Sequence, residues 1–131
     1  MEQLTKDQVS RIAGVLKERQ GKLRSEIREG LMRSANERYK DMAGMVSDTG
    51  DEAVADTLAD LGIAEIDRDV QELREVESAL VRIGTVKFGV CADCGEAIGF
   101  ERMQAHSSAA RCLACQGRHE RGYAHPKASS L

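Results

Sequence analysis

Two pairs of closely spaced cysteines constrain this chain more than any other feature of its sequence. Two residues lie within each pair and seventeen lie between the pairs, in the pattern Cys91-Ala-Asp-Cys94 and Cys112-Leu-Ala-Cys115. Such spacing is typical of a zinc site in which four thiolates complete a tetrahedral shell. A closed shell leaves no position for a reacting water. We therefore predict one structural zinc ion bound by Cys91, Cys94, Cys112 and Cys115.

Other uses of the cysteines fit the sequence less well. Four buried structural cysteines would not need this spacing, and a redox CxxC usually lies in a βαβ unit, which is absent here. An iron–sulfur cluster also takes four thiolates and stays open as an alternative. The three histidines, His106, His119 and His125, are interpreted as surface residues because the cysteines already fill the shell.

The rest of the chain favours long helices. Its single proline is Pro126, and aromatic residues make up only 3% of it, so the core must be aliphatic. Residues 1–44 begin with a capping box from Thr5 to Gln8 and carry apolar residues at helical spacing. Apolar residues at this spacing form two stripes, which predict one helix over residues 1–44 and a second over residues 52–84. The first stripe comprises Val9, Ile12, Leu16, Leu23, Ile27, Leu31, Tyr39 and Met42. The second comprises Val54, Leu58, Leu61, Ile66, Leu73, Val76, Leu80 and Ile83.

These patterns predict a mostly α fold with a long antiparallel coiled-coil helical hairpin over residues 1–84. Turn-forming residues place the break and an acidic tip at 45–53, and Gly84 ends the second helix. Residues 85–124 are predicted to form a small four-cysteine zinc module with a short C-terminal helix. Residues 125–131 are predicted to be a flexible tail.

Acidic residues gather around the predicted tip. Between residues 48 and 72 there are nine acids and one base, Arg68. A solvated helix face accounts for residues 65–72. Acids concentrated at the end of a rod repel one another, so those near the turn indicate a basic cleft or a bound Mg²⁺ as partner.

Taken together, these features resemble the DksA/TraR family of bacterial transcription regulators. The zinc-finger signature of that family is similar to Phe88 through Gly99, continued by Arg102-Met103-Gln104-Ala105 and by the second cysteine pair. The functional tip motif of the family, Asp-x-x-Asp-x-Ala, reads here as Asp48-Thr49-Gly50-Asp51-Glu52-Ala53. Its separation from the first zinc cysteine also matches that family.

The resemblance implies a protein that binds RNA polymerase directly and reads no DNA sequence. We also expect a cytoplasmic protein, a monomer because the hairpin buries its own stripes, and no enzyme because no Ser/His/Asp or Cys/His arrangement suggests an active site. On this interpretation the coiled coil enters the secondary channel of the polymerase, and its tip changes initiation by altering the stability of open promoter complexes. Asp48 and Asp51 would meet polymerase groups at the active centre, and Ala53 would permit close approach. Arg68 falls where the family has an arginine along the coil.

One departure concerns the alarmone ppGpp, which members of the family bind through basic residues at the base of the coil and in the zinc module. The corresponding positions here hold Glu75, His106 and Gln116. A carboxylate repels a polyphosphate, so we expect no response to ppGpp through this surface.

Three alternative functions remain at this stage. A GATA-type DNA-binding finger shares the cysteine spacing, but it needs bases to neutralise phosphates, and residues 116–131 offer only Arg118, Arg121 and Lys127. A factor of the GreA kind would use Asp48 and Asp51 to hold Mg²⁺ and promote transcript cleavage. A coiled-coil adaptor would use the zinc module merely as a cap. The sequence shows no apolar run long enough for a membrane span and no signal pattern at its N-terminus.

Overall fold

The computed structural model describes residues 3–34, 36–48, 54–59 and 63–129, with the backbone alone at 47, 48, 65 and 123–129. These ranges are mostly helical and contain no strand. Their helices are α1 (Lys6–Met32), α2 (Glu37–Asp48), α3 (Ala55–Ala59), α4 (Ala64–Arg82), α5 (Phe100–Ala105) and α6 (Leu113–Ser129). None of these helices is long and apolar enough to cross a membrane.

Helix α1 starts where the sequence predicts. The Thr5 side chain accepts the Gln8 N–H at 3.1 Å, and the Gln8 side chain accepts the Thr5 N–H at 2.9 Å, which confirms the capping box. This pair of bonds satisfies two N–H groups that the first helical turn leaves without an intrahelical acceptor. The N-terminus of α1 is therefore fixed by local chemistry alone.

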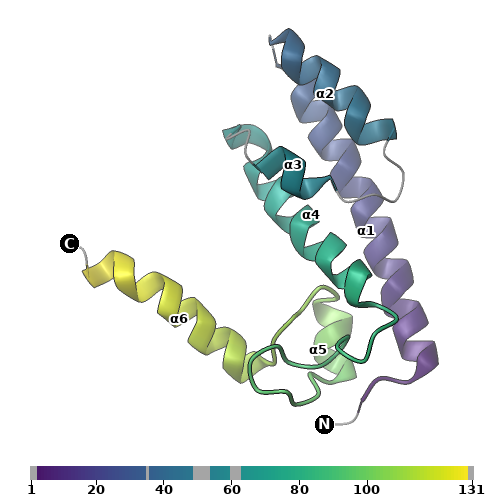
Figure 1. Cartoon of the computed structure of the whole chain (residues 1–131), viewed down its shortest axis with the longest axis vertical. Coiled ribbons are helices and arrows are strands. Elements are labelled where there is room, and N and C mark those ends of the chain that lie inside the picture. The colour runs from purple at the N-terminus through teal and green to yellow at the C-terminus, as the bar shows by residue number, and fades with distance from the viewer. Residues whose placement is uncertain (1–2, 35, 49–53, 60–62, 130–131) are drawn as a thin grey trace.

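Helices α1 and α4 pack side by side in opposite directions and form the spine of the molecule (Figure 1). Their facing residues are members of the two predicted stripes, which lie in one continuous core. Fully buried members include Leu16, Leu23, Ile27, Leu31, Ile66 and Leu73. Burying a side chain of this size contributes about 1.5–3 kcal/mol, so the stripe residues account for most of the association of the two helices.

The prediction of one helix over residues 1–44 is wrong, because the chain turns between α1 and α2. The Ser34 N–H bonds to the Leu31 carbonyl, and the Ser34 hydroxyl accepts the Asn36 N–H at 3.1 Å. The Asn36 side chain then accepts the Arg38 N–H at 2.9 Å. Asparagine is among the best N-cap residues, so it starts a new helix here instead of continuing the old one.

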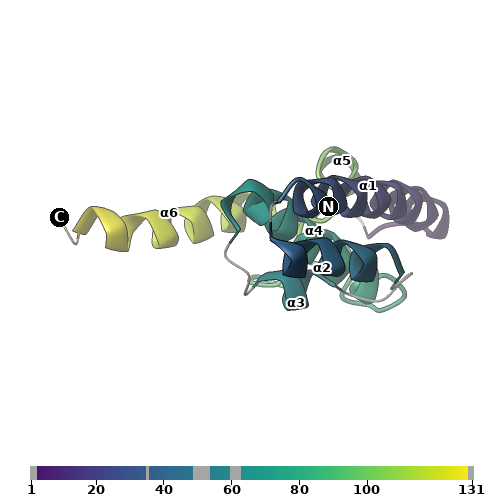
Figure 2. The same ribbon diagram turned by 90° about the horizontal axis from the view of Figure 1, so that it is seen from above.

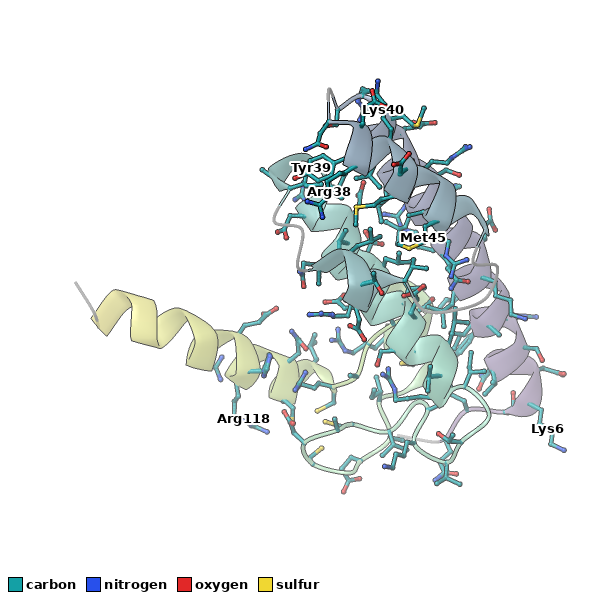
Figure 3. The ribbon with its side chains drawn as sticks, turned by 45° about the horizontal axis from the view of Figure 1, so that its top comes forward. Lys6, Arg38, Tyr39, Lys40, Met45 and Arg118 are labelled. Carbon is teal, nitrogen blue, oxygen red and sulfur yellow. The ribbon has the colours of Figure 1, made fainter. Side chains whose placement is uncertain are left out.

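Helix α2 runs back along α1 toward the zinc module. Figure 3 shows Lys40 near the end of the bundle that lies farthest from the zinc module, and Met45 closer to the middle of the molecule. Buried Ala43 and Val46 attach α2 to the common core. The far end of the bundle is therefore the turn between α1 and α2, and the long coiled-coil hairpin predicted from the sequence is replaced by a shorter, thicker bundle.

The second predicted helix, over residues 52–84, is also divided. Helix α3 covers 55–59, and Ile63 has an extended backbone, with φ −83° and ψ 111°, immediately before α4 begins. Helix α4 stops at Arg82, and Gly84 adopts a positive φ of 87°, in agreement with the predicted end. The central part of the predicted tip, residues 49–53, lies outside the described residues.

Cys91, Cys94 and Cys112 lie in loops, whereas Cys115 lies in the first turn of α6. The loops around the short helix α5 are at the opposite end of the spine from the α1–α2 turn (Figure 1). Helix α6 follows and projects away from the other helices in both views of the ribbon (Figures 1 and 2). It begins earlier than the helix predicted within 116–124, because the Cys112 carbonyl accepts the Gln116 N–H at 2.8 Å and so forms the first turn. It also continues to Ser129, through most of the segment predicted to be a tail.

Candidate metal centre

The structure brings the four cysteines into one cluster, in which all four Sγ atoms lie within 4.8 Å of one another. These zinc cysteines are Cys91, Cys94, Cys112 and Cys115. The Sγ atoms of Cys94 and Cys112 are 4.0 Å apart. A zinc ion with four Zn–S bonds of about 2.3 Å requires sulfur pairs about 3.8 Å apart. The arrangement therefore fits one tetrahedral zinc ion, which would cross-link the two loops, and it contains no disulfide.

Backbone hydrogen bonds shape the first cysteine loop. The Gly95 N–H donates to the Cys91 carbonyl at 3.0 Å, and the Cys91 N–H donates to the Glu96 carbonyl at 2.8 Å. Gly95, which directly follows the first cysteine pair, has φ 76°, a conformation that glycine adopts without steric cost. A side chain there would strain the turn that points Cys91 and Cys94 at the same centre.

Contacts beside the cysteines hold the two loops together. The Ala92 N–H donates to the Ala110 carbonyl at 2.8 Å, and the Arg111 guanidinium pairs with the Asp93 carboxylate at 2.9 Å. Asp93 lies inside the first cysteine pair and Arg111 directly precedes the second. The sequence analysis did not single out this pair, although opposite charges next to ligands on two loops are a recognisable signal.

The cysteine thiols ionise very differently. Burial would raise the pKa of Cys91, but backbone N–H groups of Cys94, Cys112 and Asp93 stabilise its thiolate and lower that pKa to about 6. The neighbouring Cys112 thiol and burial raise the pKa of Cys115 to about 12. Four thiolates cannot share this space without a cation to offset their charge, which is the electrostatic requirement that zinc meets.

Arg118 places a positive group beside the zinc cysteines. Its Nη2 donates to the Cys115 sulfur at 3.0 Å from one turn further along α6 (Figure 3). Arg118 is one of the three bases that a DNA-reading finger would need, and here it is directed to a metal ligand. Because Arg118 is engaged within the protein, fewer basic side chains are left to neutralise DNA phosphates, which weakens the DNA-binding alternative.

A small apolar set anchors the metal module to the helical spine. Phe88, Ile98 and Met103 are buried and belong to the core that includes α1. Gly89 has φ 78°, and an added Cβ there would lie 2.9 Å from the side chain of Leu4. The module is therefore seated closely against the segment that precedes α1.

The predicted tip residues are only partly described. Asp48 is the last residue of α2, where its backbone alone is described, and Asp51 and Ala53 lie outside the described residues. Arg68 is exposed on α4. Of the other acids counted around the tip, Asp56 pairs with Arg74 at 3.0 Å, so it is engaged within the protein. The role of the tip motif, defined here as Asp48, Asp51 and Ala53, stays a prediction.

Two of the three positions compared with ppGpp-binding residues meet in space. Glu75 and His106 line a shallow cavity of about 390 Å³, together with Arg19 and Glu72. Arg19 is already paired with the Glu72 carboxylate. The third position, Gln116, donates to Glu120 on α6 at 3.0 Å and does not line this cavity. Two carboxylates with one engaged arginine do not form a polyphosphate site, consistent with the expectation from the sequence.

Comparison with known proteins supports the sequence resemblance. Residues 87–121 match the family described as prokaryotic dksA/traR C4-type zinc finger. The zinc module is therefore similar to the zinc fingers of that family. The match includes all four zinc cysteines, Arg118 and the glycines at 89, 95 and 99 that adopt positive φ.

Curated proteins of the same family are similar over a longer stretch. The chain is 32% identical over 69 residues to the RNA polymerase-binding transcription factor DksA of Haemophilus influenzae, covering 53% of this chain and 48% of that protein. It is 27% identical over 93 residues to DksA of Escherichia coli, covering 71% and 61% of the two chains. The chain thus spans about half to three fifths of the length of these relatives. No solved structure is significantly similar to it.

Proposed function

We propose that this protein is a transcription regulator that binds RNA polymerase directly and acts without chemistry of its own. The observation that carries the proposal is the DksA/TraR zinc module, supported by similarity to proteins named as RNA polymerase-binding transcription factors. The closed cysteine shell supports a structural role for the metal. The activity would then lie outside the zinc module.

The tip motif is the proposed active segment. The 93 residues similar to Escherichia coli DksA must include residues 39–93 of this 131-residue chain, and therefore the whole of the motif. Its two carboxylates carry the charge that a basic or metal-containing polymerase centre would attract. We propose that they enter through the secondary channel and alter the lifetime of open promoter complexes.

The position of α2 adds a condition to this proposal. Asp48 ends α2, which runs back along α1, so a straight hairpin led by the tip motif would require α2 to swing away from the bundle. Among the α2 residues whose side chains the structure describes, Ala43 and Val46 are fully buried, and Tyr39, Met42 and Met45 also pack against the core. Moving α2 away from the bundle would therefore expose these five apolar side chains.

Substitution of Asp51→Asn tests the proposal while preserving side-chain size. We expect polymerase binding within about twofold of the wild type, and loss of most of the effect on open-complex lifetime, because the charge is removed and the shape is kept. Pull-down with purified polymerase and a promoter-complex decay assay measure the two quantities. Asp67→Asn, an exposed acid on α4, is the matched control and should change neither.

Two outcomes would contradict this function. A wild-type protein that does not bind polymerase excludes it outright. Equal loss of binding and activity in Asp51→Asn would show that the tip motif only docks. Stimulated transcript cleavage by the wild type would instead favour a factor of the GreA kind, with two acids holding a metal ion in the polymerase centre.

A further inference from the structure

A buried carboxylate lies in the middle of the helical region. Glu77 of α4 is only 6% exposed, among apolar residues of the spine. Its oxygens accept hydrogen bonds from Arg24 Nη2 at 3.2 Å and Gln20 Nε2 at 3.4 Å, both on α1. A carboxylate so far from water requires donors of this kind, since burying an unpaired charge is very costly.

The same carboxylate also binds the backbone at the start of α3. Glu77 Oε1 accepts the N–H groups of Val54 and Ala55, each at 3.1 Å. Both N–H groups belong to residues that are at most 2% exposed. These are orphan donors at a helix N-terminus, and a negative acceptor there is favourable for both hydrogen bonding and the helix dipole.

The first turn of helix α3 is held by the burial of Val54 and Ala55 and by their hydrogen bonds to Glu77. Helix α3 has five residues, far fewer than an isolated helix needs in water, and Leu58 is its buried anchor toward its other end. Val54 follows Ala53 directly, so the bonds to Glu77 fix the exact point at which the chain leaves the tip motif. An ion pair between α3 and α4, from Asp56 to Arg74, is solvent-exposed.

A second ion pair on the same helices shows what is special about Glu77. Glu72 lies five residues earlier on α4 and pairs with Arg19 of α1, five residues before Arg24. Both of its oxygens bond to that one arginine, and its side chain is 38% exposed. Glu72 thus joins two helices at the surface, whereas Glu77 joins three helices in the interior.

We propose that Glu77 is a positioning residue for the tip motif: held by Arg24 and Gln20, it fixes the N–H groups of Val54 and Ala55, the two residues that directly follow the motif in sequence. An apolar residue at this position would hold α1 against α4 equally well. It would offer no acceptor to the two backbone N–H groups. The proposal rests on the proposed function, because it assigns a task to the tip motif.

Amide hydrogen exchange tests the positioning role without the polymerase. Glu77→Gln keeps one acceptor oxygen, which the Arg24 guanidinium should retain, so that the side-chain NH2 group faces the two backbone donors. We then expect the Val54 and Ala55 amides to exchange at least tenfold faster, while the Leu23 and Val70 amides of the spine keep their rates. Glu72→Gln is the matched control, since it also removes a charge that α4 directs at an α1 arginine, and it should leave Val54 and Ala55 unchanged. Unchanged exchange at Val54 and Ala55 in Glu77→Gln would overturn the proposal.

The same two variants are then compared on RNA polymerase. Glu77→Gln should bind within about twofold of the wild type but lose at least fivefold of its effect on open-complex lifetime, and Glu72→Gln should retain both. Full activity of Glu77→Gln overturns the positioning role alone. Failure of the wild type to bind polymerase overturns the proposed function. Amide exchange then still decides whether Glu77 fixes the N–H groups of Val54 and Ala55.

A paired variant guards against a simple folding defect. If Glu77→Gln loses helical circular dichroism, Arg24→Met with Glu77→Met removes both charges together, a replacement that buried ion pairs usually tolerate. The spine should then fold, and Val54 and Ala55 should still exchange at least tenfold faster. A folded double variant with wild-type exchange at these two amides excludes the proposal.

Discussion

The zinc module and the helical spine are stabilised in opposite ways. The spine distributes its stability over two long apolar stripes, in which each buried residue contributes a small share. The zinc module has few buried side chains, chiefly Phe88, Ile98 and Met103, and gathers its remaining cross-links at one point. A defect in the spine should therefore weaken the protein by degrees, whereas a defect at the metal should remove the order of a whole module.

The largest effect is expected from Cys112→Ser. Loss of one thiolate should abolish tight zinc binding and unfold the segment around the cysteines, since metal binding contributes on the order of 10 kcal/mol in such modules. Zinc content and amide exchange over residues 85–115 measure the effect. Ser108→Ala in the same module is the control and should keep its metal.

This variant also tests whether the two regions are as independent as their chemistry implies. The amides of α1 and α4 near Leu23 and Leu73 should stay protected, because those residues are buried by each other's helices. Collapse of the spine together with the module would show that the metal supports both. Retained zinc in Cys112→Ser would contradict a site built from four thiolates.

An intermediate effect is expected at Gly30 of α1, which faces Ile66 of α4. An added Cβ at Gly30 would lie 2.6 Å from the Ile66 Cγ2 atom, and Ile66 is buried and branched at Cβ, so it cannot turn aside easily. We expect Gly30→Ala to destabilise the protein by about 1–2 kcal/mol, because overpacking outweighs the gain in helix propensity.

Gly21→Ala is the matched control on the same helix, because nothing lies within 4 Å of its added methyl group. It should stabilise the protein by about 1 kcal/mol. Urea unfolding of both variants measures the two changes in unfolding free energy. A stabilising effect in both would show that α1 and α4 are looser at Gly30 than the structure indicates.

The smallest effect concerns the surface ion pair of the spine. The hydrogen bond from Arg19, together with its charge, lowers the pKa of Glu72 below its ordinary value of 4.5. A lowered pKa in the folded state means that the contribution is fully present above pH 4.5 and is lost as the pH falls through the lower folded-state value. Because both side chains are well exposed, the contribution should be at most about 1 kcal/mol.

Urea unfolding of Glu72→Gln across pH measures this contribution. The variant should be slightly less stable than the wild type at neutral pH, and the two should converge at acidic pH once Glu72 of the wild type is protonated. Glu75→Gln, an exposed acid on the same helix, provides the comparison. A difference that persists unchanged to the lowest pH would exclude the ion pair as its cause.

The parts of this structure that follow from local chemistry were predictable. The capping box at Thr5, the zinc cysteines and the apolar stripes each follow from spacing alone, and the structure confirms the capping box, the burial of most stripe residues and a sulfur cluster that fits one zinc ion. The turn at residue 36 was missed because the apolar stripe passes through it. The signal was Asn36, which favours the start of a helix more than its interior.

The buried polar residues were missed for a different reason. Gln20 lies four residues after Leu16 and three before Leu23, in a stripe position, and Glu77 lies four after Leu73. Periodicity marks both as inward-facing, but it gives no partner for either. The two residues are 57 positions apart in sequence, and only the packed helices bring them within hydrogen-bond distance of each other.

The turn between α1 and α2 also determines how far the protein can reach. The 27 residues of α1 span about 40 Å, whereas one straight helix over residues 6–48 would span about 65 Å. The turn thus makes this part of the protein about 25 Å shorter than a straight helix over the same residues would be. Any partner that draws α2 into line with α1 must lengthen the molecule by that amount, so maximum dimension in solution scattering would report its engagement directly.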